Sequence, residues 1–600
     1  MKGRLPWAGV LLMLGGLAWL PMVSVGMSLA LHTLDRMPPR ALPFAAYYYW
    51  TQFRAEPLVA HWFPLCLGAA TVLALTPAVA LLCWPRSRVI RVARPGQTPP
   101  APLRALSDLH GSADWLSMAE ARRLFPGPHP EYGGVVVGEA YRVDQDEGAS
   151  GPFDPADPKT WGQGGKAPLL IDPCTADATH GAVFAGSGGY KTTAVTIPTL
   201  SYWTGSAVVL DPSCQVGPMT AAMRRDMDHK VIMLGPGMQG FNALDWIDPT
   251  DWMAETHIQS VIERIAGDVT AEPAGENAMF KVRGKELLTC LLADLLFDPT
   301  LPADRRTLRE FRERVRTPEK KMRGRLADIH AESNSALARD LAGTLMDVVN
   351  ETFSGIYSNA VADTQWLSIK AYADMLSGDA FQSSELTKGK LTVFINVDQE
   401  VLRATPQIAR VIVGSLLSAA YRAKGEVHGR ILFLLDEVNF LGRLRALEDA
   451  RDAGRKYGIT LVPMWQSLGQ LLQTWGKDSK DAWFNSLSWR MFAVVDEEGT
   501  AEEISKTAGR YTVVVRTQGK SSGTQSGGAS GSSNYGQNEG VSEQGRALIQ
   551  AAEVRTRLRA DETIIFRRGA APLRCGRAIY FRRPELMSRV DPDRYRPAAE

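Results

Sequence analysis

The chain has 600 residues, of which 22% are charged, and its formal net charge is +2. A chain of this length is expected to form about two to four domains. Because positive and negative charges nearly balance, the composition excludes a protein that coats nucleic acid with a general basic surface. Any polyanion must be held by a local patch.

Two segments near the start of the chain are apolar enough to cross a lipid bilayer. They run from Trp7 to Leu31 and from Trp62 to Trp84, and neither contains a charged residue. Each exceeds the roughly 20 residues that a helix needs to span a hydrocarbon core of about 30 Å. A signal peptide would also begin with basic residues, but the first apolar run is longer than its usual core. We therefore predict a two-helix membrane anchor within residues 1–95.

Basic residues near the ends of these segments predict their orientation. Lys2 and Arg4 precede the first segment. Four arginines follow the second segment, at positions 86, 88, 91 and 94. Because lysine and arginine are enriched on the cytoplasmic side of membrane proteins, both termini are expected in the cytoplasm, with a short external loop between the two helices.

After a proline-rich linker, segments typical of strands and helices alternate, which predicts a parallel sheet with crossover helices. Strands are predicted at 182–185, 207–211, 230–234, 390–397, 430–436, 459–464 and 490–495, and a helix at 192–203. Two shorter strands, at 562–568 and 578–583, are expected to lie at the edge of the same sheet. The fold class is therefore predicted as α/β.

The spacing of apolar residues is helical between the two groups of strands, from about His257 to Ser377. Segments 286–297 and 336–353 are the clearest examples. We predict an all-α domain at residues 256–385, inserted between the two parts of an α/β domain at 96–255 and 386–600. Within the second part, residues 516–545 are rich in glycine, serine and glutamine and nearly lack apolar residues, which predicts a disordered loop.

One stretch between a predicted strand and a predicted helix is similar to a phosphate-binding loop. It reads "FAGSGGYKTT" from Phe184, and the pattern G-x-x-x-x-G-K-[ST] would have glycine where Ala185 and Tyr190 stand. In such a loop, main-chain N–H groups hold phosphate oxygens, Lys191 contacts the β- and γ-phosphates, and the hydroxyl of Thr192 binds Mg²⁺. A glycine-rich turn without a ligand has a similar composition. The predicted nucleotide-binding residues are Gly186, Ser187, Gly188, Gly189, Tyr190, Lys191, Thr192 and Thr193.

Two adjacent carboxylates end the predicted strand "ILFLLDE" at Asp436 and Glu437. In P-loop enzymes an aspartate in this position binds magnesium, and a following glutamate orients and activates the attacking water. Two acids at a strand end could also only cap a turn. Their place downstream of a Lys-Thr loop favours an ATPase that binds ATP and Mg²⁺, with Thr192 and Asp436 as the metal ligands.

Two further polar residues are candidates for the same chemistry. Gln466 follows the strand predicted at 459–464, where a ring-shaped NTPase keeps a polar sensor for the γ-phosphate; the alternative is an ordinary loop residue. Arg455, in "ARDAGRKYG", could reach the phosphate of a neighbouring subunit as an arginine finger, or it could be a solvated charge at a helix end.

Together these features resemble the TraG family of type IV coupling proteins, the membrane ATPases of bacterial conjugation. The resemblance covers most of the chain and includes the apolar segments, "HGAVFAGSGGYKTTAVTIPTL", "LLDEVNFLG", "MWQSLGQLLQTWG" and "DETIIFRRGAAPLRC". It implies a RecA-like P-loop NTPase domain with an inserted all-α domain, anchored in the bacterial inner membrane and assembled as a hexamer. It also implies the roles given above for Lys191, Thr192, Asp436, Glu437 and Gln466, and that of a trans-acting finger for Arg455.

The function that the resemblance implies is to link relaxase-bound single-stranded DNA to the type IV secretion channel and to drive transfer by ATP hydrolysis. DNA binding would be nonspecific and confined to loops facing a central pore. Two alternatives remain open. One is a septal DNA translocase, although such proteins usually have four membrane spans and a C-terminal winged helix. The other is a docking receptor for protein cargo that binds nucleotide with little hydrolysis.

Overall fold

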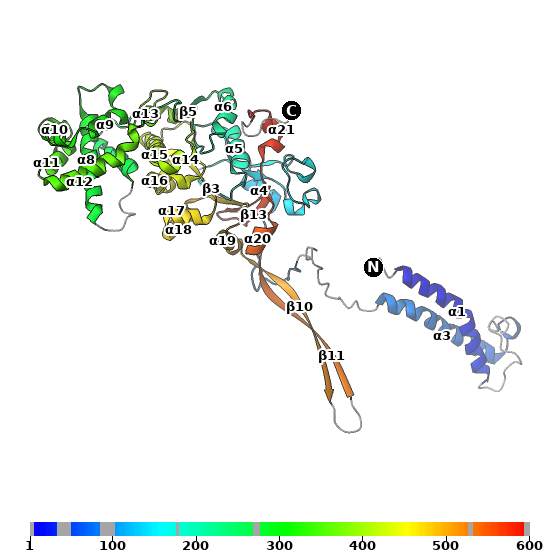
Figure 1. The fold of residues 1–600 in the computed structure, drawn as a ribbon. Helices are drawn as coiled ribbons and strands as arrows, with labels where there is room; N and C mark the ends of the chain where they lie inside the picture. The colour runs from blue at the N-terminus through cyan, green and yellow to red at the C-terminus, as the bar shows by residue number, and fades with distance from the viewer. Residues whose placement is uncertain are drawn as a thin grey trace. The chain divides into compact units, whose positions relative to one another are not determined.

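A computed structural model describes residues 5–32, 50–83, 102–175, 179–267, 276–525 and 532–592. The chain divides into two compact units, residues 1–101 and 102–600. The first unit contains the helices α1 and α3, and the second contains the large sheet and the helices that cover it (Figure 1).

In the first unit, α1 (Leu5–His32) and α3 (Pro57–Cys83) pack against each other. Within the described residues, both helices are long and apolar enough to span a membrane, with mean hydropathies of 1.9 over Val10–Ala30 and 1.8 over Pro57–Val79. A β-carbon at Gly15 would lie 2.5 Å from the carbonyl oxygen of Ala74. The absence of a side chain at Gly15 therefore allows the close approach that is typical of helix pairs in membranes.

The second unit is built on a sheet of eleven strands in the order β2-β1-β13-β12-β9-β3-β8-β7-β4-β6-β5. The seven strands from β9 to β5 are parallel, and β12, β13, β1 and β2 extend the sheet with antiparallel pairing. The strands are β1 (Val135–Glu139), β2 (Leu169–Asp172), β3 (Gly181–Ala185), β4 (Ala207–Leu210), β5 (Lys230–Leu234), β6 (Leu391–Ile395), β7 (Ile431–Leu435), β8 (Ile459–Trp465), β9 (Trp489–Ala493), β12 (Glu562–Arg567) and β13 (Leu573–Gly576).

Helices cover both faces of this sheet, so its central strands are buried on both sides. Along β3, Ala182 and Phe184 face one apolar cluster, whereas Val183 and Ala185 face the other. The helices are α4 (Met118–Leu124), α5 (Ile197–Tyr202), α6 (Val216–Asp226), α7 (Ala254–Ala266), α8 (Glu276–Phe297), α9 (Leu308–Val315), α10 (Glu319–Glu332), α11 (Ala336–Met346), α12 (Asn350–Thr364), α13 (Lys370–Met375), α14 (Gln399–Ala404), α15 (Gln407–Arg422), α16 (Arg445–Ala453), α17 (Leu468–Trp475), α18 (Lys477–Ser486), α19 (Glu498–Ala508), α20 (Ala551–Arg557) and α21 (Pro584–Met587).

The segment between β5 and β6 is helical, and α8 to α12, in green, gather at one end of the second unit (Figure 1). Their apolar side chains belong to the same cluster that covers one face of the sheet. The run predicted at 336–353 forms two helices, because α11 ends at Met346 and α12 begins at Asn350. Val348 and Val349 lie in the break, and β-branched side chains lower helix propensity.

The prediction of two edge strands after residue 560 was wrong in two respects. β12 is internal, because it pairs with β9 on one side and β13 on the other. The segment predicted as a strand at 578–583 instead forms the 3-10 turn η11 (Tyr580–Arg582). Here the chain leaves the sheet, and arginines 582 and 583 bind buried carboxylates. The pattern of apolar residues over 578–583 is the same whether the segment stays in the sheet or leaves it, so the sequence did not show that the chain turns away here.

The prediction of a disordered loop at 516–545 is also corrected. In the described residues, β10 (Arg510–Gln525) and β11 (Ser532–Ala547) form a two-stranded antiparallel ribbon that extends from the second unit (Figure 1). The prediction was based on the scarcity of apolar side chains, which shows only that the segment cannot form a core. A two-stranded ladder is held by main-chain hydrogen bonds, which do not depend on side-chain type.

Candidate active site

The predicted site residues follow the carboxyl ends of three adjacent parallel strands. Residues 186–193 follow β3, Asp436 and Glu437 follow β7, and Gln466 follows β8, which lies between β3 and β7. Ligands of open α/β sheets bind at this edge. A cavity of about 620 Å³ is lined here by Gly186, Ser187, Gly188, Gly189, Tyr190, Lys191, Thr192, Thr193, Ile197, Pro212, Ser213, Gln215, Met219, Gln399, Asp436, Glu437, Gln466, Tyr580 and Phe581.

The loop after β3 is a tight turn that requires glycine at two positions. A β-carbon at Gly186 would lie 2.7 Å from the carbonyl oxygen of Val494, and one at Gly189 would lie 2.5 Å from that of Gly186. Tyr190 has a φ of 50°, the left-handed region in which glycine is favoured. Its ring packs edge-on against Phe153, with 5.8 Å between ring centroids. Tyr190 therefore holds a strained backbone conformation at a position where the motif would have glycine.

Lys191 lies at the start of the following helix, whose first residues, Thr192–Thr196, form a π-helical turn. Its Nζ atom is 2.5 Å from Glu437 Oε1 and 3.9 Å from Asp436 Oδ1. The lysine side chain is only 9% exposed, so this ammonium group is held inside the cavity by two carboxylates. Such a group can exchange a carboxylate for a phosphate oxygen at little electrostatic cost.

Two oxygen ligands for a cation lie beside this lysine. Thr192 Oγ1 donates a hydrogen bond of 3.2 Å to Asp436 Oδ2. Burial raises the pKa of the Asp436 carboxyl to about 6, although Lys191 opposes this shift. Mg²⁺ binds through one or two protein oxygens together with phosphate oxygens and water. The hydroxyl and carboxylate fit this donor set.

Glu437 is the centre of the polar contacts in the cavity. Its Oε1 atom accepts hydrogen bonds from Lys191 Nζ and, over 3.1 Å, from Gln466 Nε2. Its backbone has a φ of 50° and a ψ of 49°, so it also adopts the left-handed conformation. The acid, the amide and the lysine predicted from separate motifs are therefore in direct contact.

Arg455 is not part of this cavity. It is exposed and lies in the 3-10 turn η10 (Gly454–Tyr457), which precedes β8. It is therefore at the amino ends of the parallel strands, whereas the predicted phosphate-binding loop is at their carboxyl ends. It lines a smaller pocket of about 220 Å³ together with His180. The role of a finger acting on a neighbouring subunit stays a prediction.

Two aromatic residues of the cavity were not singled out from the sequence. Tyr580 and Phe581 belong to η11, which contacts the start of the helix that follows the phosphate-binding loop. Their rings pack edge to face with 5.7 Å between centroids. No motif in the sequence marks this pair, because its segment is 390 residues away from Tyr190 in the chain and the pattern around it is that of a strand.

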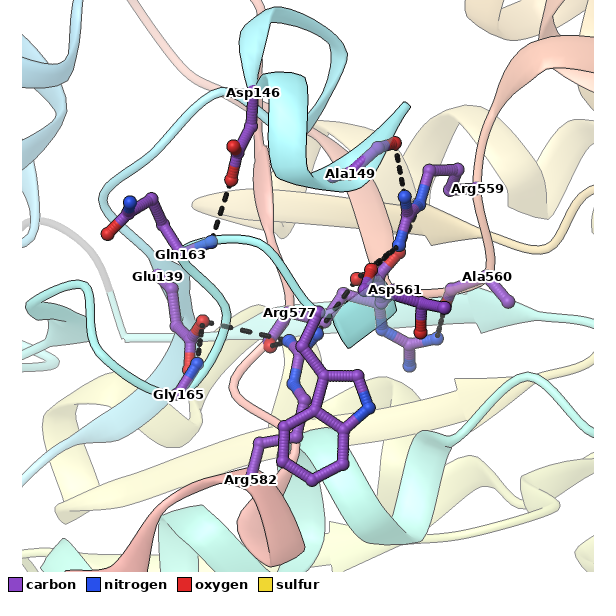
Figure 2. Close-up of polar contacts among 12 residues, drawn as sticks. Glu139, Asp146, Ala149, Gln163, Gly165, Arg559, Ala560, Asp561, Arg577 and Arg582 are labelled. Atoms are coloured by element: carbon purple, nitrogen blue, oxygen red, sulfur yellow. Dashed lines mark hydrogen bonds and ion pairs between the residues drawn. The ribbon is translucent and has the colours of Figure 1, made fainter. Parts of the chain in front are cut away.

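A buried ionic network holds η11 in place (Figure 2). Arg582 Nη1 lies 2.8 Å from Asp561 Oδ2 and its Nη2 lies 3.6 Å from Glu139 Oε2, with all three side chains inaccessible to solvent. Arg583 Nη1 binds Glu139 Oε1 over 2.9 Å. Arg559 Nε binds Asp561 Oδ1 over 2.9 Å. These ion pairs tie η11 to the segments that carry Glu139 and Asp561, and so hold the adjacent aromatic pair beside the predicted phosphate-binding loop.

Comparisons with known proteins agree with this arrangement. The family model for "Type IV secretory system Conjugative DNA transfer" matches residues 126–599. The chain is 44% identical over 494 residues to the conjugal transfer protein TraG of Rhizobium radiobacter, which covers 82% of this chain and 75% of that protein. It is 39% identical over 504 residues to the type IV secretion system-coupling protein VirD4 of Bartonella henselae, with 83% and 77% covered.

The fold is also similar to that of a solved structure. The plasmid coupling protein TrwB, in complex with ADP and Mg²⁺, matches with a TM-score of 0.53 over 81% of this chain and 97% of TrwB, at 16% sequence identity. This match supports the RecA-like architecture predicted above, and the sequence matches confirm the resemblance to TraG. The chain therefore belongs to the family of conjugative DNA-transfer proteins of type IV secretory systems.

Proposed function

We propose that this protein is the membrane-anchored coupling ATPase of a type IV secretion system. It links relaxase-bound single-stranded DNA to the transfer channel and drives transfer by hydrolysing ATP. The observation that carries this proposal is the contact between Lys191, Glu437 and Gln466 in one cavity, in a chain of this family. TrwB has been solved with ADP and Mg²⁺ and with the ATP analogue ADPNP, which supports nucleotide as the ligand.

Each polar residue of the cavity has a role in hydrolysis. Main-chain N–H groups of residues 186–190 and the ammonium group of Lys191 bind phosphate oxygens. Thr192 and Asp436 would hold a magnesium ion, which would neutralise charge on the transferred phosphoryl group. When Lys191 pairs with phosphate, Glu437 is released to orient the attacking water, and Gln466 holds the glutamate in position.

The aromatic residues of the same cavity bind the base. Among the lining residues, Tyr190, Tyr580 and Phe581 are the aromatic ones. Lys191 and Glu437 are assigned to the γ-phosphate, and the rings of Tyr580 and Phe581 in the same cavity offer a surface on which the base can stack. Stacking recognises the flat face shared by all bases, and it does not require hydrogen bonds to a particular one.

The assembly and topology follow the family expectation. The protein forms a hexamer in the bacterial inner membrane, with both termini in the cytoplasm and a short periplasmic loop between α1 and α3. The basic residues before the first apolar segment and after the second favour this orientation. In the hexamer, Arg455 acts on the nucleotide of the adjacent subunit, which accounts for its place outside the cavity of its own subunit.

Measurement of ATP hydrolysis by the full-length protein in detergent, with and without single-stranded DNA, tests the proposal. We expect Mg²⁺-dependent hydrolysis that DNA increases, and loss of this activity in Lys191→Ala. Nucleotide binding without hydrolysis in the wild type would instead support a docking receptor. Hydrolysis that is unaffected by Lys191→Ala would contradict the site.

A further inference from the structure

A second cavity, of about 560 Å³, lies where α7, α15 and the start of α16 meet. Four arginines line it: Arg264, Arg410, Arg443 and Arg445. Thr256, Gln259 and Ser260 on α7 add polar side chains. The cavity shares no lining residue with the nucleotide site.

Two of these arginines each have a guanidinium nitrogen that is buried without a hydrogen-bond partner. Arg264 is 6% exposed, and its Nη1 atom has no hydrogen-bond partner, while its Nη2 donates to Ser418 Oγ over 2.6 Å. Arg410 is half-buried, and its Nε atom is also buried without a hydrogen-bond partner among the described residues. Burial lowers the pKa of both guanidinium groups. A buried N–H group without an acceptor is unfavourable, and an anion in the cavity would supply the missing acceptor.

The other charges around the cavity limit what this anion can be. Glu263, Glu448 and Asp449 also line it, which leaves a formal charge of +1. Glu448 is paired with Arg443 over 3.5 Å, and Glu263 and Asp449 are exposed to solvent. A nucleoside triphosphate carries several negative charges and would be repelled by these acids. One phosphodiester group carries a single negative charge, and its oxygens match the guanidinium fork.

We propose that this cavity binds a phosphodiester group in the backbone of single-stranded DNA. The inference rests on the proposed function, because it identifies residues that hold the DNA substrate. Arg443 and Arg445 follow Glu437 in the chain by way of the short 3-10 turn η9 (Val438–Leu441). Single-stranded DNA held at this cavity therefore contacts the chain segment that follows Glu437, the residue that orients the attacking water. This contact couples DNA binding to ATP hydrolysis.

Binding of a fluorescent oligothymidylate to the full-length protein in detergent tests this site. Arg410→Gln should weaken binding about tenfold, as expected for loss of a charge-assisted hydrogen bond. The slope of log affinity against log salt concentration should become shallower by about 0.7, the value for one phosphate contact on a single strand. Arg410→Lys, which keeps the charge, should retain more affinity. Arg225→Gln, an exposed arginine on α6, is the matched control and should bind as the wild type does.

A structural role for Arg410 would give different results. Because the buried Nε atom of Arg410 has no hydrogen-bond partner in the described part of the chain, Arg410→Gln should not lower the melting temperature of the DNA-free protein. Arg445→Gln alters an exposed residue at the start of α16 and should weaken DNA binding with the fold intact. Wild-type DNA affinity in both variants would overturn the proposal.

Two further measurements separate this site from other ligands. A polyglutamate peptide should not compete with the oligonucleotide; equal competition, weakened equally by Arg410→Gln, would assign the cavity to an acidic protein segment and overturn the proposal. A loss of ATP affinity in Arg410→Gln as large as the loss of DNA affinity would likewise overturn it. If the wild-type protein hydrolyses ATP but binds no DNA, the proposed transfer function fails together with this inference.

Discussion

Tyr190 and Glu437 adopt left-handed backbone conformations, with a φ of 50° at each. For residues other than glycine this conformation costs on the order of 1–3 kcal/mol, and it persists where the surroundings hold it. Both residues line the nucleotide cavity, and Glu437 is held there by Lys191 and Gln466. The strain thus occurs where the proposed chemistry needs side chains in fixed directions.

Replacement of Tyr580 tests whether the aromatic pair of η11 binds the base. We expect Tyr580→Ala to raise KM for ATP about two- to tenfold, because aromatic stacking contributes roughly 0.5–1.5 kcal/mol, with little change in kcat. Tyr580→Phe keeps the ring and should behave as the wild type does. Steady-state hydrolysis measures both constants, and a lower kcat at unchanged KM would disagree with a role in base binding.

Asp172 provides a test of stability at a buried carboxyl away from the nucleotide cavity. Burial raises its pKa to about 6, while Trp489 Nε1 donates a hydrogen bond of 2.7 Å to its Oδ2. An unfolded aspartate titrates near pH 3.9, so the native state binds more protons than the unfolded state between about pH 4 and 6. The contribution of Asp172 to the free energy of unfolding therefore falls as the pH rises through this range.

The variant Asp172→Asn removes this ionisation and keeps an oxygen that can accept from Trp489. We expect a higher melting temperature than in the wild type at pH 7.5, and a difference that shrinks as the pH falls and disappears below about pH 3, where the carboxyl is protonated in both states. Thermal unfolding at several pH values measures this. A lower melting temperature of the variant at pH 7.5 would show that the ionised form is favoured in the native state.

At the scale of elements, the ribbon β10–β11 combines a base that contacts the rest of the unit with a polar outer part. Near its base, Val514 N donates to Leu103 O and Thr512 N donates to Gly111 O. Tyr511 and Val513 are buried there. The stability of the second unit is therefore expected to depend on the base of the ribbon, where Tyr511 and Val513 make its buried apolar contacts.

Deletion of residues 521–538 should leave folding nearly unchanged. Gln518 pairs with Glu539 in the ribbon, so the deletion leaves Gly519 and Lys520 as a two-residue turn that closes the ladder in its native register. We expect a melting temperature within about 2 °C of the wild type, since shortening a connection changes its closure entropy little. A large decrease would show that the outer part of the ribbon stabilises the second unit. Tyr511→Ala, at the base, should in contrast be destabilising.

At the scale of the whole molecule, the active site is proposed to be shared between subunits of a ring. Glu437→Gln and Arg455→Ala should both bind ATP, since Lys191 and Thr192 remain intact. Each should lose hydrolysis, the second by about a thousandfold if Arg455 is an arginine finger. Rings that mix the two variants should regain activity where an intact Glu437 meets an intact Arg455. Wild-type hydrolysis by assembled Arg455→Ala rings would leave Arg455 as a solvated charge.

The orientation of the anchor can be tested in the same full-length protein. A reporter that is active only outside the cytoplasm should work when it is inserted near Pro43 and fail after Arg94. This result follows from the basic residues that flank the two apolar segments. The reverse pattern would place the nucleotide site on the side of the membrane without ATP.

The sequence by itself determined the family, the two apolar helices, the parallel strands and most of the residues that line the candidate site. Lys191, Asp436, Glu437 and Gln466 were predictable because each follows a buried strand in a local pattern, and adjacent parallel strands bring their carboxyl ends together. The proposed hexamer and partners come from the family resemblance.

Only the tertiary structure decided which distant segments meet. Tyr580 and Phe581 enter the nucleotide cavity because buried arginines next to them pair with Glu139 and Asp561. Arg264 and Arg410 come from separate helices, and each has one buried guanidinium nitrogen without a hydrogen-bond partner. Local patterns report the conformation and burial of nearby residues, whereas ion pairs, unpaired charges and shared cavities arise only when segments far apart in the chain pack together.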